Sequence, residues 1–81
     1  MYYVYILQDQ NGKRYIGYTS DLKRRLQEHI DKKVYTTKRM MSLKRIYYEA
    51  YEKRVSAQIR EKKLKQFGSS YHGLIKRLEY E

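Results

Sequence analysis

The sequence predicts a small α+β fold, with a three-stranded antiparallel sheet flanked by helices in the order ββαβαα. Two short segments near the N-terminus alternate apolar and polar residues on either side of a turn, which is typical of a β-hairpin. A third β-rich segment lies mid-chain, and three segments carry apolar residues at helical spacing. The 81 residues have room for one domain, 1–81, with a modest core.

The predicted hairpin joins a strand over Tyr2–Leu7 to a strand over Arg14–Tyr18. Between them, Asp9-Gln10-Asn11-Gly12 is a run of turn-forming residues. The length of this turn matters because a slip of one residue moves every side chain of a strand to the opposite face. Two turns are compatible with the sequence.

A two-residue Asn-Gly turn pairs Leu7 with Ile16 and places Tyr5 and Tyr15 on opposite faces. A three-residue loop with a left-handed glycine pairs Ile6 with Ile16 instead. We favour the three-residue loop because it matches apolar with apolar residues and gathers the tyrosine rings. Its register gives one face with Tyr5, Tyr15 and Gly17, and another with Val4, Ile6 and Ile16.

The first helix is expected to begin at Ser20 or Asp21, because either side chain can cap free backbone N–H groups. Apolar residues recur every fourth position and predict a buried stripe of Leu22, Leu26 and Ile30. At about 100° per residue, Arg25 and His29 lie beside this stripe. The residues expected to point away are Arg24, Glu28 and Asp31. A basic residue on the packed side needs a partner, for which a phosphate is the obvious candidate.

Beyond this helix, the sequence predicts a basic loop over 31–41, a third strand over Leu43–Tyr51 and a helix over Glu52–Phe67. Gly68 is expected to end that helix, and Ser69 or Ser70 to cap the last one. On the second helix, Glu61 interrupts an apolar stripe formed with Ala57 and Leu64. The last helix has a continuous apolar face made by Tyr71, Leu74, Ile75 and Leu78.

Charge is the strongest compositional signal. Nineteen Lys and Arg residues against nine Asp and Glu give a net charge of +10, which favours a nucleic-acid partner over a generic solvated surface. Four residues are expected to contact backbone phosphates: Lys38, Arg39, Lys44 and Arg45. No cysteine, membrane span or signal-peptide pattern is present, so we expect a soluble cytoplasmic protein without disulfides or contact with a membrane.

Two tyrosines on one sheet face, an inward Arg and His, and a later Glu are suited to phosphodiester chemistry. A carboxylate can hold hydrated Mg²⁺, and Arg25 can clamp a nonbridging phosphate oxygen. A tyrosine normally titrates near ~10, but nearby cations favour the phenolate that a general base requires. The structural alternatives are an Arg25–Glu61 salt bridge, a surface ion pair for Glu61, and ordinary strand packing for Tyr5 and Tyr15.

Tyr3-Val4-Tyr5 followed by Tyr15-Ile16-Gly17 resembles the paired signature of the GIY-YIG endonuclease superfamily. Arg25 lies ten residues after Tyr15, His29 follows four later, and Glu61 lies in the helix after the third strand. This order is similar to the family's catalytic core. The resemblance spans nearly the whole chain. It is closest to small stand-alone members that are similar to the N-terminal nuclease domain of the bacterial excision-repair incision subunit.

The resemblance implies a metal-dependent endonuclease that hydrolyses DNA in one in-line step with weak sequence specificity. It implies Tyr15 as general base, Tyr5 as its helper and Arg25 as the transition-state clamp. Glu61 would bind Mg²⁺ or Mn²⁺, and His29 would assist proton transfer or phosphate binding. We expect no small-molecule cofactor, a DNA substrate that can be branched, a role in DNA repair, and targeting by a protein partner.

Three features depart from the family pattern. The first glycine of the name motif is Tyr3 here, a minor departure that is seen in the stand-alone members. The region where members often carry an Asn reads Ser70-Tyr71-His72-Gly73, and Tyr18 occupies a position where some members have Lys. These departures leave open an alternative, a non-catalytic nucleic-acid-binding module of nuclease ancestry. A third possibility is a small protein–protein adaptor, which would bind nucleic acid weakly despite its charge.

Overall fold

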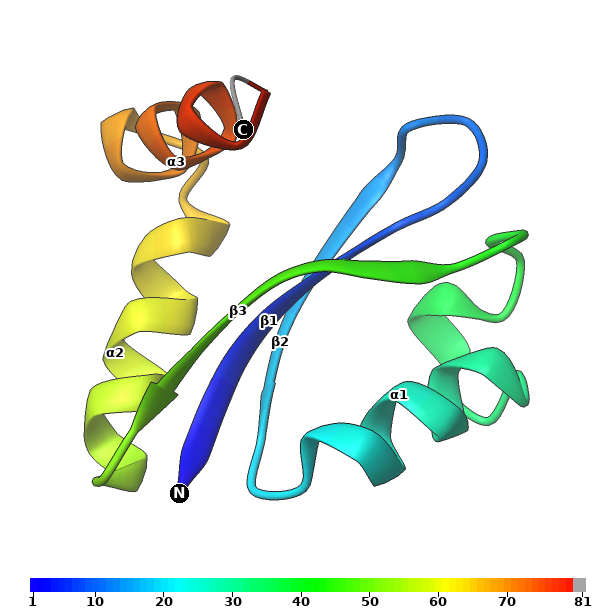
Figure 1. Ribbon diagram of the computed structural model, residues 1–81, viewed down its shortest axis with the longest axis horizontal. Coiled ribbons are helices and arrows are strands. Elements are labelled where there is room, and N and C mark those ends of the chain that lie inside the picture. The colour runs from blue at the N-terminus through cyan, green and yellow to red at the C-terminus, as the bar shows by residue number, and fades with distance from the viewer. Residues whose placement is uncertain (80–81) are drawn as a thin grey trace.

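The structure, a computed structural model, describes residues 1–79, so the last two residues of the predicted domain lie outside it. The predicted α+β class and the order ββαβαα are confirmed. The sheet is antiparallel with strand order β2-β1-β3, and α1 lies across the sheet from α2 and α3 (Figure 1). The elements are β1 (Tyr2–Gln8), β2 (Arg14–Thr19), α1 (Leu22–Ile30), the 3₁₀ turn η1 (Tyr35–Thr37), β3 (Lys44–Tyr51), α2 (Arg54–Lys65) and α3 (Ser69–Glu79).

The hairpin has the three-residue loop and the register that the sequence favours. Ile6 pairs with Ile16, and Gly12 adopts a left-handed φ of 82°. The Asp9 backbone N–H donates to the Lys13 carbonyl at 2.9 Å, which closes the loop. The Asp9 carboxylate accepts two further backbone N–H bonds inside the loop. Tyr5 and Tyr15 therefore lie on one face of the sheet.

The apolar core fills the space between the opposite face and helices α2 and α3. Its centre comprises Val4, Ile6, Ile16, Ala57, Leu64, Tyr71, Leu74 and Ile75, all buried. These residues include the predicted apolar face of the last helix, with Leu78 packed against its margin. Burial of aliphatic and aromatic side chains is the main force that holds this half of the molecule together.

A buried carboxylate ties β3 to α2 at the margin of this core. Glu49 accepts hydrogen bonds from the hydroxyls of Tyr47 and Tyr51 and from the Arg60 guanidinium at 3.0 Å. Burial alone would raise the pKa of Glu49, but these hydrogen bonds outweigh it and hold the pKa below its usual value. The ion pair is structural, because all its members lie on the core side of the sheet.

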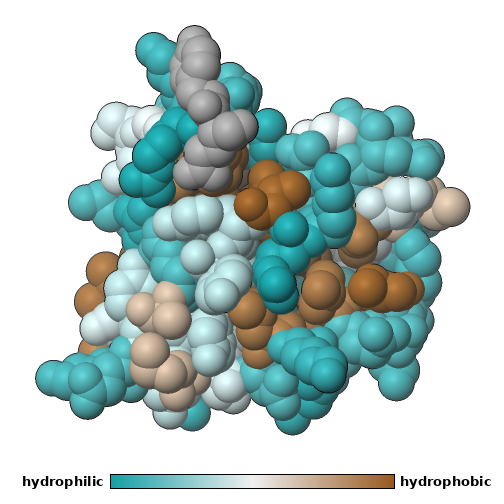
Figure 2. Space-filling model, viewed as in Figure 1, coloured by the Kyte–Doolittle hydropathy of each residue, from teal (hydrophilic) through white to brown (hydrophobic). Residues whose placement is uncertain are grey.

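The first helix packs differently from the prediction. Leu22 and Leu26 are only half-buried and Ile30 is 47 % exposed, whereas His29 is the buried residue of α1. The predicted stripe is wrong because α1 covers the tyrosine face, where a side chain that can hydrogen-bond is favoured over an aliphatic one. Figure 2 shows a mostly hydrophilic surface with apolar patches on the α1 side, consistent with this partial exposure.

The boundary between the last two helices also differs. Phe67, not Gly68, has the left-handed φ of 54° after α2, which ends at Lys65. The Gly68 carbonyl accepts the His72 N–H, and α3 begins at Ser69, so the predicted serine cap is displaced by one residue. The predicted Asp21 cap of α1 is confirmed, since its carboxylate accepts the Arg24 N–H at 3.1 Å. Within residues 1–79, no helix has the length and apolarity needed to cross a membrane.

Candidate active site

A buried hydrogen-bonded chain crosses the tyrosine face of the sheet and joins three elements. The hydroxyl of Tyr5 on β1 lies 2.9 Å from Nε2 of His29 on α1. Nδ1 of His29 lies 2.7 Å from the hydroxyl of Thr37 on η1. His29 and Thr37 are fully buried, and Tyr5 is 2 % exposed. Each polar group in the chain has a partner, which satisfies the requirement for burying it.

Burial fixes the protonation of this chain. It raises the pKa of Tyr5 to about 12, against the opposing effect of Arg25, so Tyr5 remains a neutral phenol. Burial and then the positive charge of Arg25 lower the pKa of His29 to about 4, so the imidazole is neutral near pH 7. A neutral imidazole donates from one nitrogen and accepts at the other, which matches its two hydroxyl partners.

Gly17 allows the Tyr5 ring to lie against β2. A Cβ at this position would overlap the Tyr5 hydroxyl and lie 2.6 Å from its Cζ atom. Real Cβ atoms essentially never approach other atoms so closely. The φ of Gly17 is not left-handed, so its backbone conformation does not require glycine. The glycine of the YIG triplet is required because a larger residue would clash with the neighbouring Tyr5 ring.

Tyr15 and Arg25 lie on the more solvent-exposed side of the Tyr5–His29–Thr37 hydrogen-bonded chain. The Tyr15 ring packs on His29 with a centroid separation of 5.0 Å, but Tyr15 is only half-buried. The Arg25 side chain is 35 % exposed and pairs with Glu28 at 3.1 Å. Burial disfavours the Arg25 charge, but hydrogen bonding to Glu28 and the proximity of Tyr5 raise its pKa above the ordinary value. The structural alternative of an Arg25–Glu61 salt bridge is not what the structure has, because Arg25 pairs with Glu28 of its own helix.

Glu61 approaches the same region from α2. Its side chain is 18 % exposed and pairs with Lys65 of the next helical turn at 3.3 Å. The Lys65 ammonium also lies over the Tyr15 ring, 5.9 Å from its centroid. The charge of Glu61 acts on the Tyr5 hydroxyl, as do the charges of Arg25 and Tyr15. Side chains from β1, β2, α1 and α2 thus converge on one site.

The donor set at Glu61 fits a hard divalent cation. Residues 1–79 contain no group of three His, Cys, Asp or Glu side chains close enough to enclose a metal. Mg²⁺ does not require such a cage, because it commonly binds one or two carboxylates and completes its shell with water and substrate phosphates. A single, partly exposed carboxylate beside the tyrosine face meets that requirement once it exchanges Lys65 for the metal.

Comparison with known proteins identifies this arrangement. Residues 1–73 match the model of the GIY-YIG catalytic domain. The chain belongs to the GIY-YIG family. It is 37% identical over 65 residues to the UPF0213 proteins SAG0778 and gbs0798 of Streptococcus agalactiae, serotypes V and III, a match that covers 79% of this chain and 74% of each relative. The solution NMR structure of the UPF0213 protein BH0048 from Bacillus halodurans is similar with a TM-score of 0.59 and 28% identity, covering 96% of this chain and 85% of that one.

The four basic residues predicted to contact nucleic acid lie in the loop after α1 and at the start of β3. Lys38 and Arg39 line an open hollow beside the β1–β2 loop, where Lys38 lies 4.6 Å from the centroid of the exposed Tyr35 ring. Lys44 and Arg45 are exposed at the start of the edge strand β3. All four are accessible, so their predicted phosphate contacts stay open to test.

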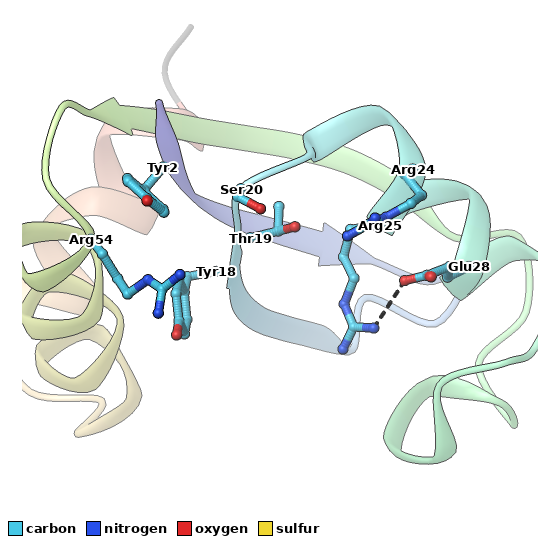
Figure 3. A pocket seen from close by; sticks show the side chains of 8 residues that line it. All are labelled: Tyr2, Tyr18, Thr19, Ser20, Arg24, Arg25, Glu28 and Arg54. Carbon is cyan, nitrogen blue, oxygen red and sulfur yellow. Dashed lines mark hydrogen bonds and ion pairs between the residues drawn. The ribbon is translucent and has the colours of Figure 1, made fainter.

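Sequence reasoning missed three contributors to the site. Thr37 fixes the second nitrogen of His29, and Lys65 pairs with Glu61. The spacing of Glu61 and Lys65, four residues apart on a helix, is a signal that predicts their ion pair. The Thr37 contact has no such signal, because it depends on how the basic loop folds back. Arg54, which lies across a cleft from Arg25, was also missed (Figure 3).

Proposed function

We propose that this protein is a metal-dependent endonuclease that hydrolyses DNA phosphodiester bonds with weak sequence specificity. The observation that supports it best is the convergence of side chains from four elements: the partly exposed Tyr15, Arg25 and Glu61 gather around the buried Tyr5. A basic chain of +10 draws a polyanion to that surface. A divalent metal agrees with membership of the GIY-YIG family and with the partly exposed carboxylate of Glu61.

Tyr15 is the proposed general base. Its ring packs on His29 while the residue stays partly exposed, so its oxygen, in the phenolate form, can accept the proton of an attacking water. Tyr5 is too deeply buried for this role and remains protonated. It is a positioning residue: its hydroxyl is fixed by His29, and its ring fixes the β2 backbone at Gly17.

We propose for His29 a role different from the predicted one in proton transfer or phosphate binding. Both ring nitrogens are engaged and the residue is fully buried. In our proposal His29 therefore orients Tyr5 and supports Tyr15, and it touches neither water nor phosphate.

The two remaining site residues, Arg25 and Glu61, are proposed to stabilise charge: Arg25 on the phosphate, and Glu61 by binding the metal ion. The Arg25 guanidinium donates to a nonbridging phosphate oxygen and stabilises the charge that grows there as water attacks phosphorus and the opposite P–O bond breaks. Glu61 would hold the cation, in exchange for its ion pair with Lys65. Mg²⁺ or Mn²⁺, when bound, supplies charge stabilisation at the phosphate and the leaving oxygen.

A cleavage assay with a matched carboxylate variant tests the proposal. Supercoiled plasmid and flapped DNA are incubated with wild type or Glu61→Gln in Mg²⁺, Mn²⁺ or EDTA. We expect nicking by wild type with either metal, and none with EDTA or with Glu61→Gln. Glu79→Gln, at the exposed end of α3, is the control and should cut like wild type. Equal cutting by wild type and Glu61→Gln would remove Glu61 from the site.

The Lys65–Glu61 ion pair favours a second candidate, a non-catalytic nucleic-acid-binding module. A carboxylate already neutralised at 3.3 Å has less affinity for a cation. Salt-sensitive DNA binding without metal-dependent nicking in the same assay would establish this second function.

A further inference from the structure

A charged cleft lies beside the candidate active site and shares one residue with it. It has a volume of about 350 Å³ and runs across the end of β2, between the start of α1 and the start of α2 (Figure 3). Its lining consists of Tyr2, Tyr18, Thr19, Ser20, Arg24, Arg25, Glu28 and Arg54. Because Arg25 belongs to both, a phosphate clamped by Arg25 lies at the mouth of this cleft.

The charge of the cleft suits a second phosphate. Three arginines face one carboxylate, Glu28, which pairs with Arg25. Within residues 1–79, neither Arg24 nor Arg54 has a carboxylate oxygen within salt-bridge distance. Both are exposed, so each can turn its guanidinium toward an incoming anion.

The aromatic walls of the cleft suit a base. The Tyr2 ring lies under the Arg54 guanidinium, 5.5 Å from centroid to Cζ. The Tyr18 hydroxyl accepts a hydrogen bond from the Gln58 amide at 3.0 Å, which fixes the ring beside the cleft. Aromatic rings with interleaved arginines are the usual platform for unpaired nucleotides, since every base has a face that can stack.

We infer that this cleft binds the nucleotide next to the scissile phosphate, with its base unpaired. A base that stacks on Tyr18 has left its duplex, so the protein favours single-stranded or flapped DNA over continuous duplex. Arg54 and Arg24 hold the phosphate on the far side of that base. The inference rests on the proposed function for the identity of its ligand, a DNA strand.

Binding in EDTA tests the inference without requiring cleavage. Fluorescence anisotropy measures the affinity of the full chain for a labelled single-stranded oligonucleotide and for a duplex of the same sequence, over a range of salt. The variants are Arg54→Gln, Tyr18→Leu and Tyr18→Phe. Arg77→Gln, an exposed arginine on α3 that lies outside the cleft lining, removes the same charge elsewhere and is the control.

We expect Tyr18→Leu to bind the single strand about tenfold more weakly, while Tyr18→Phe binds like wild type because it keeps the ring. Arg54→Gln should lower the slope of log affinity against log salt by about 0.7 for the single strand. Arg77→Gln should change this slope less than Arg54→Gln does. The affinity for the duplex should fall equally in both arginine variants. Thermal unfolding verifies that each variant folds. Arg54 is exposed, so its replacement removes only its contact with the Tyr2 ring and leaves the core intact.

The inference would be overturned if Arg54→Gln and Arg77→Gln bound the single strand with equal affinity. It would also be overturned if the cleft variants lost as much affinity for the duplex as for the single strand. Parallel cleavage assays separate it from the proposed function. Wild type that binds the single strand through Arg54 and Tyr18 but never cuts overturns the nuclease and leaves a binding cleft. Wild type that cuts, while these variants bind normally, overturns the cleft alone.

Discussion

The two faces of the sheet are built on different principles. The face toward α2 and α3 is closed by close-packed apolar side chains such as Ile6, Ile16 and Leu64. The face toward α1 is closed by rings and hydroxyls, with His29 as the only buried residue of the helix. The same three strands thus present a stabilising surface on one side and the proposed reactive surface on the other.

Because of this difference, the residues that stabilise the fold are not the residues that position the proposed reacting groups. Apolar packing on the α2 side is non-directional, so it stabilises the fold without fixing any reacting group. The Tyr5–His29–Thr37 chain is directional, and it holds the partly exposed Tyr15 ring at a defined place. Substitutions on the two faces should therefore have separable effects on unfolding and on cleavage.

The largest expected change in stability comes from the apolar face. Leu64→Ala leaves a cavity at a fully buried position and should lower the free energy of unfolding by about 2–5 kcal/mol. Urea denaturation followed by circular dichroism measures it. The cleavage rate of the remaining folded fraction should match wild type, and a tenfold slower rate in that fraction would show that the faces are coupled.

Arg25→Ala should produce the opposite pattern. The loss of the phosphate clamp should slow single-turnover cleavage by about 10²–10³, by analogy with a lost oxyanion donor. The half-exposed pair with Glu28 adds about 0–1 kcal/mol, so stability should change little. Lys23→Ala, on the exposed face of the same helix, is the control. An Arg25→Ala variant that cuts as fast as Lys23→Ala would exclude the clamp.

Low pH should lower the free energy of unfolding through protonation of His29 on the polar face. The pKa of His29 falls from 6.5 in the unfolded chain to about 4 in the fold, so the unfolded state binds the proton first. The free energy of unfolding should therefore decrease by about 3 kcal/mol as the pH falls from about 6.5 to about 4. NMR titration of the His29 ring, with exposed His72 as a reference signal, measures this pKa directly. A value near 6.5 would contradict the buried neutral imidazole.

The sequence was sufficient for the apolar face, because its signals are periodic and local. The Ile6–Ile16 pairing, the left-handed Gly12 and the α3 stripe follow from turn chemistry and from spacings of two to four residues. The polar face was predicted only in part. The family motif indicated which residues gather there, and helical spacing placed His29 on the packed side. Neither indicated that His29 is fully buried or that Ile30 is exposed.

The polar face was harder to predict because a polar side chain is buried only where partners far away in the sequence complete its hydrogen bonds. His29 is stable inside the protein only because Tyr5 and Thr37, from two other elements, complete its hydrogen bonds. Apolar periodicity assigns the buried side of a helix to leucine and isoleucine, so it placed the α1 stripe wrongly. The Tyr18–Arg54 cleft was missed for the same reason, since β2 and α2 meet only in the fold.

Tyr15→Phe tests the division between the two faces most directly, because it removes one oxygen atom from the reactive surface. Single-turnover cleavage of flapped DNA in Mg²⁺ and urea denaturation are measured on the same preparation. The account predicts that cleavage slows by about 10²–10⁴, the usual contribution of a general base, while the free energy of unfolding changes by less than about 0.5 kcal/mol. Cleavage at the wild-type rate would contradict the assignment of Tyr15 and, with it, of the tyrosine face as the active site.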